Sequence, residues 1–316
     1  MPEQPVRKYP ARRAIALLIV VAFLGLFPAL REPAGPPAQA QTTGQAVQPT
    51  VIGAKCQQCH KPVVQSFALD GHGKSAKFLK DSRATPCESC HGDGTKHIET
   101  LEPKDIVNPP RLTTAEANES CLQCHSRDRT HQSWRGGPHD RKDISCLSCH
   151  SAHHAKSPER MLTKPNVEET CLSCHKDKQK ALFQRSTHLF RTENRVMKVN
   201  CVSCHDPHGG EGRNMLQAHT TNGLCYQCHA DKRGPLLWEH APVQENCLTC
   251  HTPHGSNNVK LLTTRSHQLC QQCHINLLSR HQTVSGFDVF TFNRGCVNCH
   301  TQIHGSNHPS GRAFTR

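Results

Sequence analysis

One five-residue motif, C-x-x-C-H, constrains the fold of this chain more than any other feature. It occurs ten times in 316 residues, and the ten copies contain all 20 cysteines. Two thiols three residues apart can reach the two vinyl groups on one edge of a porphyrin, and the histidine that follows can then bind the iron. The motif therefore predicts ten covalently bound haem c groups.

We expect each motif to supply two thioether bonds and one iron ligand. The motifs lie at 56–60, 87–91, 121–125, 146–150, 171–175, 201–205, 225–229, 247–251, 270–274 and 296–300. The predicted haem-binding thiols are Cys56, Cys59, Cys87, Cys90, Cys121, Cys124, Cys146, Cys149, Cys171, Cys174, Cys201, Cys204, Cys225, Cys228, Cys247, Cys250, Cys270, Cys273, Cys296 and Cys299. The predicted proximal iron ligands are His60, His91, His125, His150, His175, His205, His229, His251, His274 and His300.

Zinc ribbons and disulfides are the two competing interpretations of these cysteines. Disulfides are the usual state of thiols in exported proteins. Neither alternative requires a histidine after the second cysteine. Histidine accounts for 25 of the 316 residues. If positions are independent, the probability that a histidine follows the second cysteine in all ten motifs by chance is on the order of 10⁻¹¹. Haem attachment is therefore the interpretation that the sequence supports.

The composition agrees with a chain that folds around cofactors. Hydrophobic residues make up 35% and aromatic residues 4% of the sequence, which is little for a large core of side chains. Ten porphyrins would supply the missing apolar mass, with roughly 28 residues for each haem. We expect mostly irregular chain with short helices wrapped round ten haems, and little or no β-sheet.

The second axial ligands should also be histidines, because only three methionines follow Met1. Such bis-His iron is low-spin and has a lower potential than His/Met iron. One set of candidates follows the second motif of each pair, and the other lies between the two motifs. These candidates are His97, His153, His208, His254 and His304, and His72, His139, His188, His240 and His281. His154 also fits the "CHSAHH" copy, but the register favours His153.

The motifs group into five two-haem units with a period near 50 residues, which predicts an elongated array of repeats. The expected bounds are 51–110, 111–160, 161–214, 215–260 and 261–316. Leucines at 112, 162, 216 and 262 mark a second common register. We expect the tail, residues 304–316, to be frayed.

The first 40 residues have the layout of a cleaved secretory signal peptide. Four basic residues precede an apolar run at 14–30, and alanines at 38 and 40 follow. An uncleaved anchor helix is the alternative, but the run is short for a membrane span. The sequence therefore predicts export out of the cytoplasm.

The positive charge does not indicate a nucleic-acid partner. The formal net charge of the chain is +13. Residues 1–40 contain five basic and two acidic side chains, so the remaining residues have a net charge of about +10. Ten haems would add about twenty propionates, which lysine and arginine suit as partners. An exported chain without a pattern of stacking aromatics is not expected to bind nucleic acid.

The chain is expected to carry electrons rather than to catalyse a reaction. All ten motifs end in histidine rather than lysine, and there are enough further histidines to close every iron. No nucleotide-binding fingerprint, P-loop or serine elbow is present. A multihaem reductase is the less favoured alternative.

With its ten motifs, its signal segment and the "CHDPHG" and "CHTPHG" turns at 204–209 and 250–255, the chain resembles the MtrA/DmsE-type periplasmic decahaem cytochromes. The resemblance covers essentially all of the chain after the signal. It implies a periplasmic protein held at the outer membrane within a large β-barrel porin, in extracellular electron transfer such as metal reduction or iron oxidation. It also implies periplasmic cytochromes as electron donors or acceptors, and possible docking of an extracellular multihaem cytochrome.

A soluble periplasmic shuttle, or a subunit that delivers electrons to a terminal reductase, would have the same motifs. Either kind of protein would be removed from the outer membrane by a salt wash, whereas a chain enclosed in a barrel would stay until detergent is added. The sequence alone leaves this alternative open.

Overall fold

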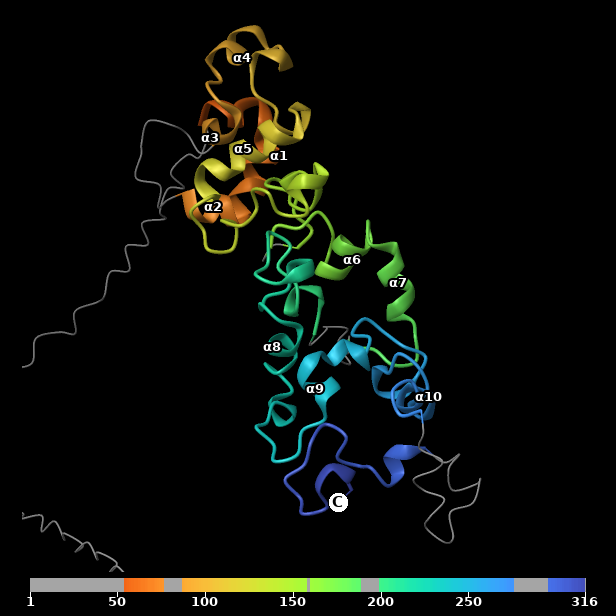
Figure 1. Ribbon diagram of the computed structural model, residues 1–316. Helices are drawn as coiled ribbons and strands as arrows, with labels where there is room; N and C mark the ends of the chain where they lie inside the picture. Colours follow the sequence, from red (N-terminus) through yellow and green to blue (C-terminus); the bar gives the residue numbers. More distant parts are fainter. Residues whose placement is uncertain (1–53, 77–86, 158–159, 189–198, 276–294, 316) are drawn as a thin grey trace, which may run out of the picture. The chain divides into compact units, whose positions relative to one another are not determined.

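Short helices and irregular segments make up the chain, as Figure 1 shows. The computed structural model describes residues 54–76, 87–157, 160–188, 199–275 and 295–315. The predicted signal peptide at 1–40 and the candidate ligand His281 lie outside these residues. All of the described residues belong to one unit, Gln48–Arg316.

The helices of the described residues are short, and the longest has 16 residues. The α-helices are α1 (Ala54–Leu69), α2 (Gly71–Ala76), α3 (Glu88–His91), α4 (Thr95–Thr100), α5 (Thr114–His125), α6 (Val167–Leu172), α7 (Lys176–Leu182), α8 (Thr221–Cys225), α9 (Ala241–Glu245) and α10 (Ser266–Gln271). The 3₁₀ turns are η1 (Pro103–Asp105), η2 (Pro109–Arg111), η3 (Asp140–Lys142), η4 (Cys146–Ser148), η5 (Cys201–Ser203), η6 (Arg213–Met215), η7 (Ala230–Lys232), η8 (Cys247–Thr249), η9 (Val259–Leu261), η10 (Cys296–Asn298) and η11 (Gly311–Ala313). No helix among them has the length and apolar character that a bilayer span requires.

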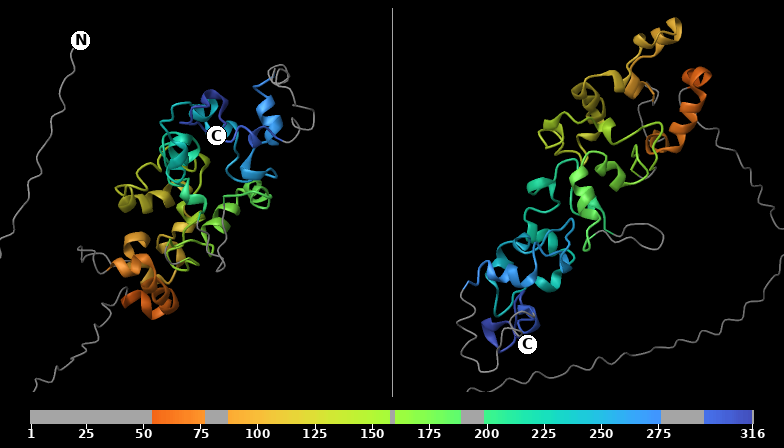
Figure 2. Two further views of the ribbon diagram at one scale, coloured as in Figure 1. Left: turned by 90° about the horizontal axis from the view of Figure 1, so that it is seen from below. Right: turned by 90° about the vertical axis from the view of Figure 1, so that its right-hand side faces the viewer.

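The described residues contain no β-strand, and their extended contacts are seven isolated bridges. The two further views in Figure 2 likewise show helices and loops without a sheet. Few apolar side chains bury one another; among the described residues the buried ones are Ala117, Leu122, Trp134, Leu162 and Leu261. The prediction of an irregular multihaem fold with short helices and little or no sheet is confirmed.

Each C-x-x-C-H motif forms one helical turn. In the eight motifs other than 56–60 and 121–125, the histidine N–H donates to the carbonyl of the first cysteine at 2.9–3.0 Å. In those two the motif lies within helices α1 and α5. Residues i, i+3 and i+4 of a helical turn lie on one face. The turn therefore directs both thiols and the imidazole to the same side, as attachment to one porphyrin requires.

The first motif of most units sits at the end of a capped helix. Thr113 and Glu116 form a reciprocal capping box at the start of α5. Asn166 caps α6, and Thr220 caps α8, each by accepting a backbone N–H three residues later. These side chains satisfy N–H groups that a helix start leaves unpaired. Local sequence therefore fixes where these motif helices begin.

One asparagine holds the two motifs of the second unit together. The Asn118 amide nitrogen donates to the Ile144 carbonyl at 3.1 Å, and its oxygen accepts the Cys146 N–H at 2.8 Å. Asn118 is buried, with 4% of its surface exposed. Asn222 makes the same contact with the Cys247 N–H at 2.8 Å in the fourth unit. These side chains fix the distance between two haem sites.

Replacing Asn118 by alanine is expected to destabilise the second unit by about 1–3 kcal/mol, because the buried Cys146 N–H loses its acceptor. The haem-loaded variant should therefore unfold at lower denaturant concentration than the wild type. Asn108→Ala is the matched control, since the Asn108 side chain makes no capping hydrogen bond in η2. Equal unfolding midpoints for Asn118→Ala and Asn108→Ala would contradict this role.

A bridged loop follows the second motif of three units. His150 pairs with Leu162, His205 with Leu216, and His251 with Leu262 as isolated antiparallel bridges. The residue before each leucine, Met161, Met215 and Leu261, has a positive φ of 51°, 57° and 59°. The leucine register read from the sequence therefore marks a returning chain segment in three units. Leu112 forms no such bridge among the described residues. After the 87–91 motif, Val107 instead forms two hydrogen bonds with the motif histidine, His91.

The C-terminal tail differs from the expectation of a frayed end. Trp238 and Ser306 exchange two backbone hydrogen bonds of 2.9 Å, and Figure 1 shows this last segment in dark blue below α9. The Phe314 carbonyl accepts the Gln302 N–H at 2.9 Å. Composition alone suggested a loose tail, but backbone pairing with the fourth unit and the last motif fixes residues 301–315.

Candidate haem-binding sites

The structure places nine motif histidines each opposite one histidine that lies outside the motifs. The nine outside histidines are all candidates predicted from the sequence, and none faces two motifs in this way. The pairs are His60–His97, His91–His153, His125–His72, His150–His208, His175–His139, His205–His254, His229–His188, His251–His304 and His274–His240. The tenth candidate from outside the motifs, His281, lies outside the described residues.

The spacing within these pairs fits an iron held between two imidazoles. A metal–imidazole bond is about 2.0 Å long, and the centre of a ring with bonds of about 1.33 Å lies about 1.1 Å from each of its atoms. Two imidazoles on opposite faces of one iron therefore have ring centres about 6 Å apart. The nine pairs have centroid separations of 5.8–6.3 Å, a narrow range compared with the roughly 4.5–7 Å of ordinary aromatic pairs.

Hydrogen bonds at Nδ1 leave Nε2 as the nitrogen available to iron. His91, His150, His205, His251 and His300 direct Nδ1 to a backbone carbonyl at 2.5–2.9 Å. Among the outside histidines, His97, His139 and His188 do the same at 2.9–3.0 Å. Such second contacts fix the tautomer and the ring orientation of a metal-bound histidine.

Burial keeps six of the outside histidines neutral. Burial lowers the pKa of His208 to about 4, with His131 and His150 as further causes. Burial is also the first cause that lowers the pKa of His72, His153, His240, His254 and His304. Only neutral imidazole can bind a metal ion, so at neutral pH these side chains are in the binding form.

The pairs connect different units rather than closing each unit on itself. At the junction of the first two units, His72 of the first faces His125 of the second, and His153 of the second faces His91 of the first. The next three junctions repeat this exchange of one histidine in each direction. At the first end the pair His60–His97 lies within one unit. Each of these four junctions therefore places two histidine pairs between neighbouring units.

The thiols place consecutive motifs next to each other. Within each unit the first cysteines of the two motifs lie close enough for one thiol to raise the pKa of the other: Cys56 acts on Cys87, Cys121 on Cys146, Cys201 on Cys171, Cys247 on Cys225, and Cys296 on Cys270. Burial and the Cys56 thiol raise the pKa of Cys87 to about 11. Between units, burial and the charge of a neighbouring thiol raise the pKa of the second cysteines: Cys121 and Cys124 act on Cys90, Cys174 on Cys149, Cys228 on Cys204, and Cys273 on Cys250. The motifs therefore adjoin in the order in which they occur in the sequence.

Glycines after two of the outside histidines allow a close backbone approach. Gly209 has a φ of +127°, and a Cβ there would overlap the backbone carbonyl of Ser133. A Cβ on Gly255 would overlap the carbonyl of Ala181. Ser133 and Ala181 lie in the segments that lead to His139 and His188. The "PHG" turns therefore seat one outside histidine against the segment that carries another.

Other features of the described residues fit haem and its carboxylates. The indole N–H groups of Trp134 and Trp238 are buried and have no protein acceptor. A buried donor without an acceptor is unfavourable, and a haem propionate is an acceptor of the right kind. None of the 20 thiols forms a disulfide. The donor set thus suits covalent haem with two histidine ligands.

The structure also separates His153 from its neighbour. The His153 ring faces His91 at 5.8 Å, whereas the ring of His154 contacts that of His153. Sequence reasoning found the outside histidines but not their pairing, which depends on contacts between units. It also left His131 without a role, although this ring lies 4.2 Å from His208. The "HSRD" sequence after the 121–125 motif was the one available signal for a carboxylate near His125.

Comparison with known proteins identifies similar sequences along the chain. The doubled CXXCH motif family matches residues 194–234 and 240–277. The family of NrfB-like c-type cytochrome proteins matches 87–174, and the family of cytochrome c7 and related cytochromes matches 42–126. "Multiheme cytochrome MtrA" of Shewanella baltica (strain OS185) is 40% identical over 277 residues, covering 83% of this chain and 80% of that protein. Each description names a cytochrome or the haem-binding motif itself, which supports covalently bound haem c.

Proposed function

The chain belongs to the MtrA family of multihaem c-type cytochromes, and from this premise we propose that it carries electrons across an outer membrane from within a β-barrel porin. Transfer of electrons by covalently bound haem c is the activity that family membership supports. Ten haems, the predicted thioether cysteines and the paired histidines are part of the proposal. Haem iron, when bound, accepts and releases one electron by cycling between Fe(III) and Fe(II).

The run of neighbouring motifs from 56–60 to 296–300 is the observation that carries this proposal. Electrostatic interactions between thiols link the two motifs within each unit and the adjoining motifs of neighbouring units. Haems held by these thiols would lie in one unbranched sequence, so an electron could pass between the ends without leaving the protein. The opposed histidines would close both faces of each iron, which favours electron transfer over substrate binding.

The thickness of a membrane explains why such a sequence of haems needs a porin partner. A bilayer with its headgroups is about 40–45 Å thick, so a single pair of haems cannot connect its two sides. A barrel of about 16–18 strands encloses an aqueous channel, and one of about 22 strands can hold a plug. The proposed partner is a barrel of this size, with soluble cytochromes as donors and acceptors at either end. The proposed location is the periplasmic side of the outer membrane, after export by the signal peptide.

Extraction from outer membranes followed by a vesicle assay tests this function. We expect the chain to remain after a high-salt wash and to be released by detergent together with a large β-barrel protein, identified by mass spectrometry. Vesicles that contain this complex should reduce an enclosed redox dye when dithionite is added outside. Quantitative release by salt alone, without a barrel protein, would instead favour a soluble shuttle or a subunit that delivers electrons. A large high-spin iron fraction in the resting protein would favour an enzyme.

A further inference from the structure

A carboxylate contacts the motif histidine of the third haem site. Asp128 Oδ2 lies 2.6 Å from His125 Nδ1. Five other motif histidines direct Nδ1 to a neutral backbone carbonyl within the described residues: His91, His150, His205, His251 and His300. His125 is therefore the motif histidine whose second nitrogen donates to a negative charge.

The end of α5 explains how Asp128 reaches this nitrogen. The Ser126 N–H continues the helix by donating to the Leu122 carbonyl at 3.0 Å. The Asp128 N–H then donates to the His125 carbonyl at 3.1 Å, which turns the chain back toward the motif. Because Asp128 follows His125 by three residues, the carboxylate lies over the imidazole on the same side of this turn.

Two similar aspartates elsewhere in the chain have other partners. Asp177 and Asp231 each follow a motif histidine by two residues instead of three. Asp177 pairs with Lys178 and Asp231 pairs with Lys232, both at 2.8 Å. A difference of one residue in spacing thus separates a carboxylate bound to histidine from one bound to lysine.

The Asp128 carboxylate is ionised at neutral pH. Aspartate ordinarily titrates far below pH 7, and the hydrogen bond with His125 lowers the pKa of Asp128 further. About half of the Asp128 side chain is exposed, as is 41% of the His125 side chain. Solvent weakens such a pair, but the short hydrogen bond at Nδ1 remains directed at the ring.

We propose that Asp128 lowers the reduction potential of the haem in the 121–125 motif. It does so by accepting a hydrogen bond from the Nδ1–H group of His125, the proximal ligand of that haem. This rests on the proposed function. A carboxylate acceptor makes a metal-bound histidine a stronger donor, and a stronger donor stabilises Fe(III) relative to Fe(II). One electron is exchanged in this couple, no covalent bond changes, and the proton stays on Nδ1. Asp128 is thus a positioning residue that makes the third haem harder to reduce than it would be with a neutral acceptor.

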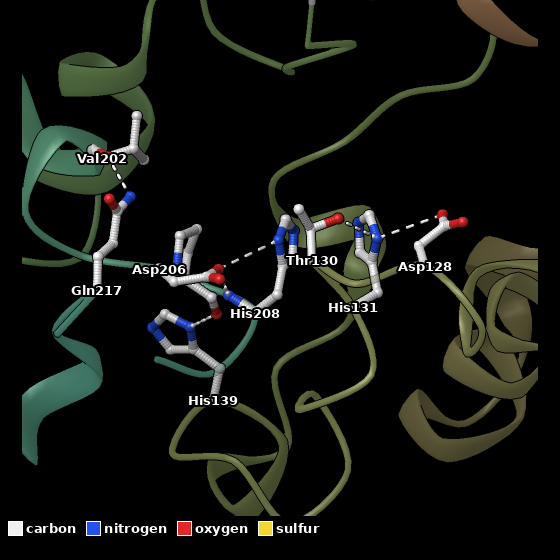
Figure 3. Close-up of polar contacts among 9 residues, drawn as sticks. Asp128, Thr130, His131, His139, Val202, Asp206, His208 and Gln217 are labelled. Carbon is white, nitrogen blue, oxygen red and sulfur yellow. Dashed lines mark hydrogen bonds and ion pairs between the residues drawn. The ribbon is translucent and has the colours of Figure 1, made fainter. Parts of the chain in front are cut away.

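A second histidine connects this carboxylate to the next iron site. His131 Nδ1 lies 3.5 Å from Asp128 Oδ2 and 2.9 Å from the Thr130 hydroxyl (Figure 3). On its other side the His131 ring lies 4.2 Å from the ring of His208, the histidine that faces His150. Asp128 and His131 therefore bridge the third and the fourth haem sites.

The same three side chains, His125, Asp128 and His131, have ligand atoms within 4.8 Å of one another, a spacing that could hold a small metal ion. The hydrogen bond of 2.6 Å already occupies His125 Nδ1. Iron bound at the opposite nitrogen of His125 leaves no further nitrogen for another metal. A tuning contact to haem is therefore the better interpretation of this cluster.

Redox titration of the purified, haem-loaded chain tests the proposal without a membrane or a barrel. We expect Asp128→Asn, which keeps the size and an acceptor oxygen but removes the charge, to shift about one-tenth of the iron to higher potential. A shift of about tenfold in the Fe(III)/Fe(II) ratio corresponds to 59 mV for one electron. The low-spin EPR signal of one haem should change together with this potential.

Asp177→Asn is the matched control, because it removes the same charge two residues after a motif histidine without removing a hydrogen bond to that histidine. Identical titrations and EPR spectra for wild type and Asp128→Asn would overturn the proposal. An equal shift in Asp177→Asn would also overturn it, since the effect would then be general. Mass spectrometry counts the haems of each variant. If Asp128→Asn has lost a haem, Asp128→Glu is used as the test variant in its place. A change in one EPR signal is then expected, and an unaltered spectrum contradicts the proposal. A failed vesicle assay would leave these titrations valid.

Discussion

Removing His208 is expected to leave the haem of the 146–150 motif high-spin, although His208 follows the 201–205 motif by only three residues. The His208 ring faces His150 at 6.0 Å, whereas His205 faces His254 at the same distance. The His131 ring lies 4.2 Å from His208 and could replace it as a ligand, so the double variant His131→Ala/His208→Ala is the decisive one. About one-tenth of the iron should become high-spin, measured by EPR and by the optical spectrum of the oxidised protein.

Removing the thiols of one motif at a time identifies the affected haem. The high-spin signal of the double variant should disappear when Cys146 and Cys149 are also changed to alanine. It should persist when Cys201 and Cys204 are changed instead. His131→Ala alone is the control, because His131 is not part of the nine histidine pairs and its loss should leave all iron low-spin. The reverse dependence on the two motifs would show that the ligand exchange between units is wrong.

Loss of one interior haem is expected to stop conduction between the two ends of the protein. Changing both Cys201 and Cys204 to alanine removes the thioether bonds of the sixth motif, which lies between Cys171 and Cys228 in the sequence of thiol contacts. An electron would then have to cross the place of a missing haem. Reduction of an enclosed dye by vesicles that hold the complex should fall to the level of vesicles without the chain.

The matched control for this variant is His219→Ala. His219 is 82% exposed and forms an ion pair with Glu211, outside the nine histidine pairs. The His219→Ala variant should retain all haems and should reduce the dye at the wild-type rate. Mass spectrometry should find one haem fewer in the cysteine variant, with the other haems still bound. Dye reduction at the wild-type rate by a chain that lacks the sixth haem would rule out a single unbranched route.

The sequence predicted the local parts of this fold because those parts depend on short-range chemistry. The C-x-x-C-H spacing requires one helical turn, and the structure forms that turn in each motif. The threonines before α5 and α8 are local helix caps. The glycines of the "PHG" turns were expected to allow tight turns, and Gly209 has the positive φ that such a turn requires.

Contacts between distant residues could not be predicted from one sequence. His208 and His150 are 58 residues apart, and nothing in either local sequence names the other. The spacing of repeats predicted an array in which each unit contacts its neighbours, but it did not predict that neighbouring units exchange histidines. Asn118 shows the same limit, since its contact with the Cys146 N–H depends on how two motifs approach each other. The acceptor of His125 Nδ1 likewise depends on the turn after α5.

The reciprocal exchange of histidines at each junction restricts how a protein of this kind can change length during evolution. A new unit inserted in the interior would receive one histidine from each neighbour and give one to each, so every iron would remain coordinated on both faces. A unit appended beyond His60, with the pair His60–His97 retained, would receive no histidine for its own second motif. Lengthening should therefore occur by internal duplication, with the original terminal units retained.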